Sequence, residues 1–183
     1  MSNKPRICVA LFHRNAITVE KDALARLGYA MYHWAILIRP TAFKEIDQCT
    51  LIDATDGMNF NPITHIDSNP SHDWWYRVRT PANPHSTGSF LNALEIGKLR
   101  GGTTVEQIRE LLATVPLPRK QQEPPQHCAT WAYDAIEMLQ RAGHVAATDG
   151  VHDIMERAMQ MAHRVMADGP AEVVAGPQCC GVQ

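Results

Sequence analysis

Cys128 is the residue whose position best suits nucleophilic chemistry. Pro124 and Pro125 stand just ahead of it, and because the position before a proline disfavours helix, a helix can begin cleanly after them. The small and apolar residues that follow recur at helical spacing: Cys128, Ala132, Ala135, Ile136, Leu139 and Ala142. In the first turn, unpaired N–H groups and the helix dipole favour a thiolate. The same spacing is equally typical of a small buried core residue, so both interpretations stay open.

A histidine and an acid earlier in the chain have the types needed to activate such a thiol. Residues 29–38 are aromatic and β-branched, which predicts a central strand with His33 in its middle. Residues 49–54 predict a second strand, and Asp53 lies near its end, before a turn signal at residues 55–57. A strand-borne histidine can act as a general base, and a neighbouring carboxylate can orient its ring. The alternatives are a core histidine with a satisfied hydrogen bond and an acid that only begins the turn.

The remaining patterns predict an α+β fold, with an antiparallel sheet of about four to five strands packed against helices. Further strands are expected over residues 7–12, 73–79 and 90–99, a long loop over 58–72, and helices over 103–115, 128–142 and 150–166, with 16–27 ambiguous. Thr103 and Glu106 match a capping box at the start of the first of these helices. Residues 1–167 are expected to form one domain, and 168–183 a loose tail.

Two further side-chain patterns, one of arginines and one of methionines, are each compatible with two interpretations. Arg77 and Arg79 alternate with apolar residues, as on a solvated sheet edge or on a face that meets an acidic substrate group. Met159 and Met161 in the last helix are typical of core packing or of an oligomer interface through that C-terminal helix.

Composition narrows the class of protein. The chain has 183 residues, of which 45% are hydrophobic and 20% charged, with a formal net charge of -2, so neither nucleic acid nor an anionic membrane is an expected partner. The five cysteines include no C-x-x-C pair, so no metal site, cofactor or disulfide framework is expected. No apolar run is long enough to span a bilayer and the N-terminus lacks a signal-peptide core, which favours a cytoplasmic protein.

The order of these motifs resembles the circularly permuted papain-like fold, in the branch of the NlpC/P60 superfamily that includes lecithin retinol acyltransferase-like and PPPDE-type proteins. In those families a histidine comes first, on a strand similar to Tyr32-His33-Trp34-Ala35-Ile36, and a polar partner lies on the next strand. The nucleophile comes last, at a helix start similar to Cys128-Ala129-Thr130-Trp131. The likeness covers about residues 28–142 and extends to small fungal proteins with His-Trp-Ala and Cys-x-Thr-Trp motifs.

Two residues depart from the acyltransferase pattern. The position before the cysteine, often Asn in those relatives, is His127, and the partner position, His in those relatives, is Asp53. The change to Asp53 is compatible with orienting the ring, whereas His127 leaves the oxyanion site open.

The resemblance implies thiol chemistry on a small-molecule or peptide substrate. Cys128 would form an acyl-thioester during hydrolysis or transfer of an amide, isopeptide or ester, with His33 as the base and Asp53 orienting it. Two further functions stay open: a non-catalytic binding module on the same fold, and a small biosynthetic enzyme that cyclises a peptide-like metabolite.

Neighbouring residues complete the expected site. The Cys128 backbone N–H, with Gln122 or Gln126, is expected to stabilise the oxyanion. His127 is a rival base, and Trp34 either lines the cleft or packs in the core.

Overall fold

The computed structural model describes residues 4–41 and 47–168, which form an antiparallel sheet covered by helices. The five-stranded sheet has the order β4-β3-β2-β1-β5, and its strands are β1 (Arg6–His13), β2 (Tyr32–Arg39), β3 (Cys49–Thr55), β4 (Trp75–Ala82) and β5 (Phe90–Lys98). The helices are α1 (Ala16–Val19), α2 (Ala23–Leu27), α3 (Val105–Ala113), α4 (Cys128–Arg141) and α5 (Val151–Asp168), with short 3-10 segments at Gly28–Met31 and Pro84–Thr87. The predicted α+β class is confirmed.

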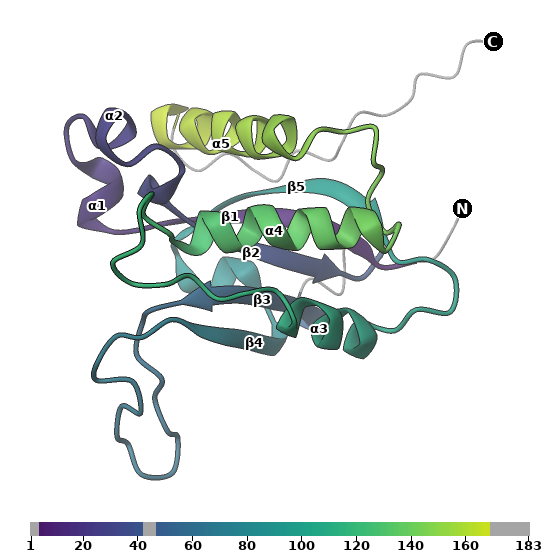
Figure 1. Ribbon diagram of the computed structural model, residues 1–183, viewed down its shortest axis with the longest axis horizontal. Coiled ribbons are helices and arrows are strands. Elements are labelled where there is room, and N and C mark those ends of the chain that lie inside the picture. Colours follow the sequence, from purple (N-terminus) through teal and green to yellow (C-terminus); the bar gives the residue numbers. More distant parts are fainter. Residues whose placement is uncertain (1–3, 42–46, 169–183) are drawn as a thin grey trace.

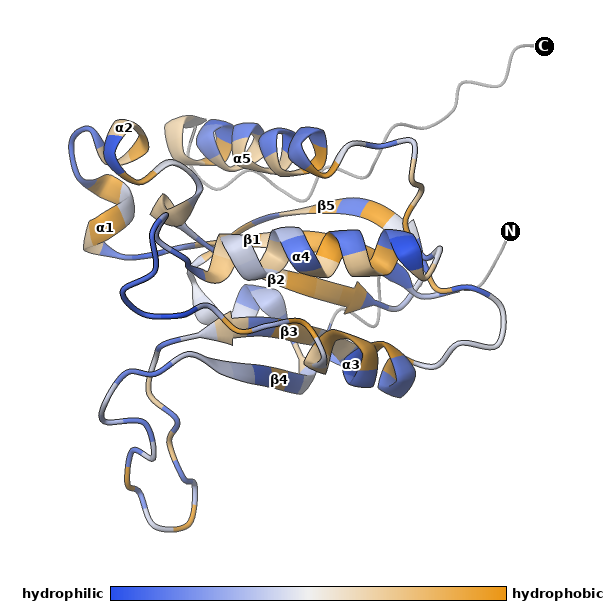
Figure 2. Ribbon diagram, viewed as in Figure 1, coloured by the Kyte–Doolittle hydropathy of each residue, from blue (hydrophilic) through white to orange (hydrophobic). Residues whose placement is uncertain are grey.

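The helices α3, α4 and α5 pack on one face of the sheet, with α4 across its middle (Figure 1). The two long helices, α4 and α5, each carry polar and apolar residues along their whole length (Figure 2). Trp34 of β2 and Trp131 of α4 are completely buried in this layer. Burial of a large apolar side chain stabilises a fold by about 1.5–3 kcal/mol, so this layer is the main source of cohesion.

Side chains of the other parity point to the second face of the sheet, because successive residues of a strand alternate. Ala35 and Leu37 of β2 pack there with Leu51 of β3 in a second, smaller apolar cluster. His33 and Asp53 have the same parity as these residues, so the pleat directs both side chains to this second face.

The β2 strand begins later than its sequence suggests. Residues 28–31 form a 3-10 turn after α2, where Gly28 has a positive φ of 51°, and the strand starts only at Tyr32. His33 is therefore the second residue of β2 and lies at the beginning of the strand. The prediction that His33 lies in the middle of a strand is wrong.

The capping box of α3 is displaced by one residue from the predicted one. Thr104 accepts a hydrogen bond on Oγ1 from the Gln107 N–H at 3.2 Å, and Gln107 Oε1 accepts from the Thr104 N–H at 2.9 Å. The predicted pair Thr103 and Glu106 is wrong because the Thr103 N–H donates to the Arg100 carbonyl in the preceding turn.

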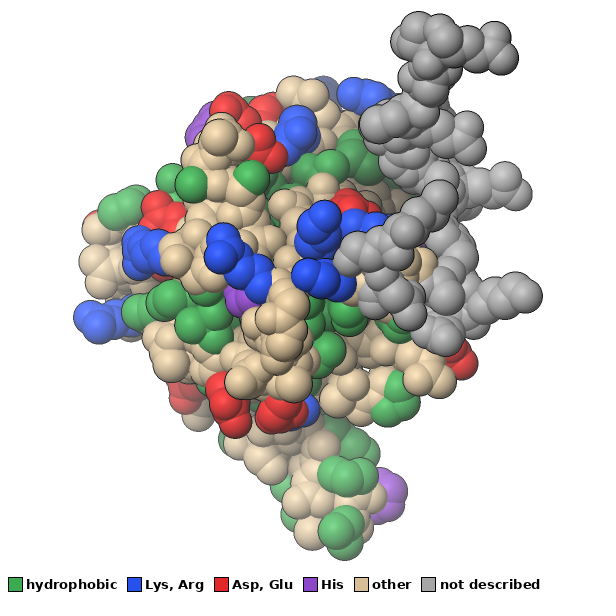
Figure 3. Space-filling model, turned by 90° about the vertical axis from the view of Figure 1, so that its right-hand side faces the viewer, with side chains coloured by type: hydrophobic (Ala, Val, Ile, Leu, Met, Phe, Trp, Pro, Cys, Tyr) green, Lys and Arg blue, Asp and Glu red, His purple; other side chains and the backbone are tan. Residues whose placement is uncertain are grey.

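The long β3–β4 connection projects from the body of the protein and carries apolar side chains at its tip (Figure 3). Met58, Phe60, Ile63 and Ile66 are all exposed there, Ile63 to 86%. The predicted loop over residues 58–72 is confirmed, since it holds neither helix nor extended strand.

The described residues include only part of the C-terminal region for which predictions were made. The expected tail beyond Asp168, with Cys179 and Cys180, lies outside the described residues. Met159 is buried in the core of the helix layer, whereas Met161 is half-buried. Across residues 4–41 and 47–168, the helices are too short or too polar for any of them to cross a membrane.

Replacement of Thr104 by alanine is expected to lower the free energy of unfolding by about 1 kcal/mol, because the Gln107 N–H loses its cap. Thr103→Ala is the matched control and should change stability by less than about 0.5 kcal/mol. Urea denaturation followed by circular dichroism measures both values. Equal losses in the two variants would contradict the displaced cap.

Candidate active site

Cys128 is the first residue of α4 and is almost fully buried, with 2% of its surface exposed. Its thiol donates a long hydrogen bond to the Tyr32 carbonyl at 3.7 Å. The ladder between β2 and β3 pairs only residues 36–38 with 50–52, so it stops before it reaches Tyr32 and His33. The first residue of α4 thus contacts β2 beyond the end of the β2–β3 ladder. There the Cys128 side chain, and not a β3 backbone group, binds the Tyr32 carbonyl.

His33 joins the thiol to a buried acid. Its Nε2 lies 3.3 Å from Asp53 Oδ2, and its side chain is 19% exposed. Within the described residues Nε2 makes no hydrogen bond of good geometry, so this contact is primarily electrostatic. Nε2 is directed to the carboxylate, and Cys128 also acts on the charge of the ring.

Asp53 is completely buried and is held by two arginines from the neighbouring strand. Arg77 donates from Nε to Oδ1 at 2.9 Å and from Nη2 to Oδ2 at 3.0 Å, and Arg79 Nη2 donates to Oδ2 at 2.9 Å. Arg77 is the cross-strand neighbour of Asp53, and its guanidinium lies over the Trp75 ring at 5.9 Å. A bidentate pair fixes the orientation of the carboxylate as well as its charge.

The surrounding charges set the protonation of the acid and the imidazole. Burial alone raises the pKa of Asp53, but His33 and Arg77 outweigh it and hold that pKa well below its usual range. Burial alone lowers the pKa of His33, but the Asp53 carboxylate and the adjacent Cys128 side chain raise it to about 9. The imidazole is therefore protonated at neutral pH, which is the form that stabilises a thiolate.

The three residues expected to do chemistry are thus brought together by three different elements. Cys128 comes from the helix layer, whereas His33 and Asp53 belong to the second face of the sheet. Sulfur and imidazole meet at the end of the β2–β3 ladder, where the sheet no longer separates its two faces.

The other predicted site residues lie in different surroundings. Trp34 is completely buried in the helix layer and donates its indole N–H to the Tyr29 carbonyl at 2.7 Å, so it does not face a cleft. Gln122 and Gln126 line a cavity whose lining includes neither Cys128 nor His33.

His127 caps α4 directly before Cys128. Its backbone N–H donates to Thr130 Oγ1 at 3.3 Å, and its Nδ1 is buried without a hydrogen-bond partner among the residues described. Burial, together with the charge of Arg14, lowers the pKa of His127, so this ring is uncharged at neutral pH.

Sequence reasoning missed the role of Arg77 and Arg79. Neither a solvated edge nor a substrate contact describes them, because both guanidinium groups bind Asp53. The signal was present: an acid within an apolar strand needs cationic partners, and two arginines of one parity follow on the next predicted strand. The cross-strand register that joins them was not deducible from spacing.

No group of three or more histidine, cysteine or acidic side chains suited to a metal ion occurs among residues 4–41 and 47–168. The chemistry available at this site is that of a thiol, an imidazole and a clamped carboxylate.

Asp53→Asn is expected to lower the free energy of unfolding by about 3–5 kcal/mol, because two partly buried guanidinium groups and an imidazolium lose their counter-ion. Asp73→Asn removes an exposed carboxylate paired with Lys120 and serves as the control, with a loss below about 1 kcal/mol. Chemical denaturation distinguishes the two. A loss at Asp53 no larger than at Asp73 would refute the clamp.

The raised pKa of His33 predicts a specific dependence of stability on pH. The folded protein binds the His33 proton more tightly than the unfolded chain, so the stabilisation is fully present below the ordinary imidazole pKa of 6.5 and disappears as pH rises through about 9. The loss is on the order of 3 kcal/mol. His33→Asn should remove this part of the slope, while His65→Asn, in the exposed loop, should keep it. Unfolding free energies measured from pH 6 to pH 10 test this, and equal slopes in wild type and His33→Asn would reject it.

Comparison with known proteins adds the family. The search of curated proteins and the search of solved structures found no match for the chain. The signature of one family, described as a family of unknown function (DUF6914), matches residues 4–170 and so spans every strand and helix given above. The chain therefore belongs to the DUF6914 family.

Proposed function

We propose that this protein is a thiol-dependent hydrolase or acyltransferase that acts on an amide, isopeptide or ester. The observation that carries the proposal is the position of His33, whose ring lies 3.3 Å from a clamped Asp53 carboxylate and is raised in pKa by the Cys128 side chain. Nucleophile, base and orienting group occur in the order of the permuted papain-like fold, and the five-stranded antiparallel sheet with a helix across it is compatible with that fold.

The reaction would proceed through an acyl-thioester on Cys128. The attacking form would be a Cys128 sulfur that has lost its proton, beside the protonated His33 imidazole. The sulfur attacks the acyl carbonyl, and as the bond to the leaving group breaks, the imidazolium gives that group its proton. Water or an acceptor amine or hydroxyl then attacks the thioester, while neutral His33 takes the proton of the attacking group. Hydrolysis, transfer and cyclisation differ only in this acceptor.

The start of α4 would supply the oxyanion site. The N–H groups of a first helical turn have no partner within the helix, and they point towards the region in front of Cys128. Donors of this kind stabilise the negative oxygen of a tetrahedral intermediate. Gln122 and Gln126 contribute to a separate cavity, so the backbone is the better candidate.

A non-catalytic binding module is the second candidate, and one observation favours it. Cys128 is 2% exposed and its thiol is already bound to the Tyr32 carbonyl, as in a structural cysteine. Catalysis would require the acyl group to displace this contact and the neighbouring side chains, whereas a binding module would leave the sulfur unreacted.

Acylation by 4-nitrophenyl acetate separates the two functions. In a Cys179→Ser, Cys180→Ser background, intact mass should show one added acetyl group, and peptide mapping should place it on Cys128. Cys8 and Cys49 should not react, because burial raises the pKa of these thiols to about 12 and about 11. His33→Asn should slow acylation by about 100-fold or more, since the base is lost.

The matched control is His127→Asn, which changes the rival base and keeps a residue suited to cap the helix. Its acylation rate should stay within a few-fold of the parent rate. Circular dichroism establishes that each variant is folded. An unreactive Cys128 in the folded parent, or equal rates in the parent and His33→Asn, would leave the binding module as the function.

A further inference from the structure

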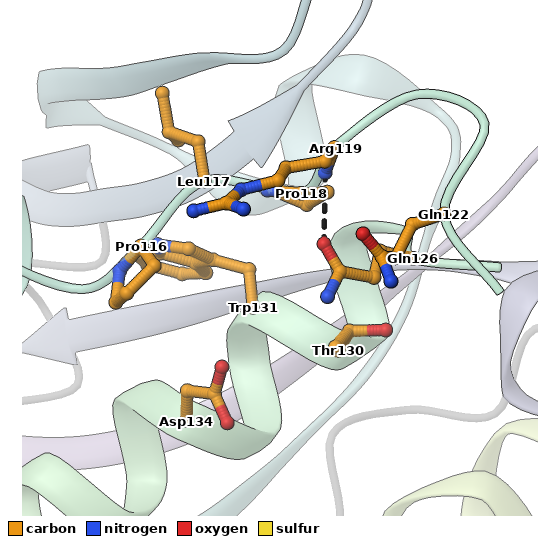
Figure 4. Close-up of a pocket in the computed structure, with 9 residues that line it drawn as sticks. All are labelled: Pro116, Leu117, Pro118, Arg119, Gln122, Gln126, Thr130, Trp131 and Asp134. Carbon is orange, nitrogen blue, oxygen red and sulfur yellow. Dashed lines mark hydrogen bonds between the residues drawn. The ribbon is translucent and has the colours of Figure 1, made fainter. Parts of the chain in front are cut away.

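The cavity that Gln122 and Gln126 line lies between the α3–α4 connection and the first turns of α4. It encloses about 250 Å³ and includes neither Cys128 nor His33 (Figure 4). The side chains that give it chemical character are Arg119, Gln122, Gln126, Trp131 and Asp134. Binding sites for drug-sized ligands occupy about 300–1,000 Å³, so this cavity fits a smaller molecule.

The cavity has opposite charges that do not pair with each other. Arg119 and Asp134 both line it, and Figure 4 shows them on either side of the Trp131 indole. Among the described residues neither side chain forms an ion pair, and Arg141, the cation nearest to Asp134 along α4, binds Glu137 instead at 2.8 Å. A ligand with two charges of the complementary signs would therefore meet both groups.

Trp131 supplies an unused hydrogen-bond donor. The residue is completely buried, and its Nε1 has no acceptor among the described residues. A buried donor without a partner costs about 1–3 kcal/mol, so such a group is rare unless something else satisfies it. Because the Trp131 ring forms a wall of the cavity, a bound molecule would change the surroundings of its indole N–H.

Two polar contacts restrain the lining loop. Gln126 Oε1 accepts a hydrogen bond from the Arg119 N–H at 2.9 Å and ties the two ends of the 119–126 segment together (Figure 4). Lys120 pairs with Asp73 at 2.9 Å and attaches the same segment to the chain just before β4. A preorganised site loses less conformational entropy on binding.

We propose that this cavity binds a small zwitterion of amino-acid or dipeptide size. The carboxylate of the ligand binds the Arg119 guanidinium, its ammonium group binds the Asp134 carboxylate, and its body lies against the Trp131 ring. Binding here does not depend on the thiol chemistry proposed above, since no atom of Cys128 or His33 lines the cavity.

Titration of the ¹⁵N-labelled full chain with alanyl-alanine tests the site by NMR. The Trp131 indole N–H signal should move and saturate. Arg119→Gln should weaken binding of the dipeptide by about tenfold or more, as expected for loss of one charge-assisted contact. Asp134→Asn should do the same, whereas Arg164→Gln, an exposed arginine on α5, should leave the affinity unchanged.

Capped probes assign each charge to its partner. The C-terminal amide of alanyl-alanine should bind more weakly than the free dipeptide, and Arg119→Gln should weaken it no further. N-acetylated alanyl-alanine should likewise bind more weakly than the free dipeptide, and Asp134→Asn should weaken its binding no further. Cys128→Ala should bind the dipeptide as the parent does, so a failure of the thiol chemistry leaves this result intact.

Two outcomes would overturn the proposal. In one, the Trp131 indole signal does not respond to the dipeptide while the spectrum shows a folded protein. In the other, the signal moves but Arg119→Gln, Asp134→Asn and Arg164→Gln all bind with equal affinity, which would mean that the charges facing the cavity do not recognise the ligand.

Discussion

A fully buried carboxylate is the constraint on which the candidate site depends. Asp53 has no exposed surface, so its charge must be balanced within the fold, and Arg77, Arg79 and His33 all contact it. The three contacts bind β2, β3 and β4 together at one point of the sheet. They also decide the state of His33, because the same carboxylate that is held by arginines keeps the imidazole protonated.

The second constraint is where the sheet stops pairing. The β2–β3 ladder is three residue pairs long, so the beginning of β2 has no β3 partner. The first turn of α4 occupies this end of the strand, and Cys128 bonds to the Tyr32 carbonyl. The early end of one ladder therefore allows a residue from the helix layer to approach two residues that point to the opposite face.

Helix α4 connects the two sites of the molecule. Cys128 is the first residue of the helix and bonds to β2, and Trp131 and Asp134, within the first two turns, line the cavity with Arg119.

By itself the sequence determined the elements and the types of residue that matter: the α+β class, the helix that starts at Cys128, and the placement of His33 and Asp53 on successive strands. These features follow from local periodicity, prolines and turn signals, which act over a few residues. Only the tertiary structure decided that Arg77 and Arg79 clamp Asp53, that Trp34 is core, and that Gln122 and Gln126 belong to a different cavity. Those outcomes depend on strand register and on helix packing against the sheet, where a shift of one residue sends a side chain to the other face.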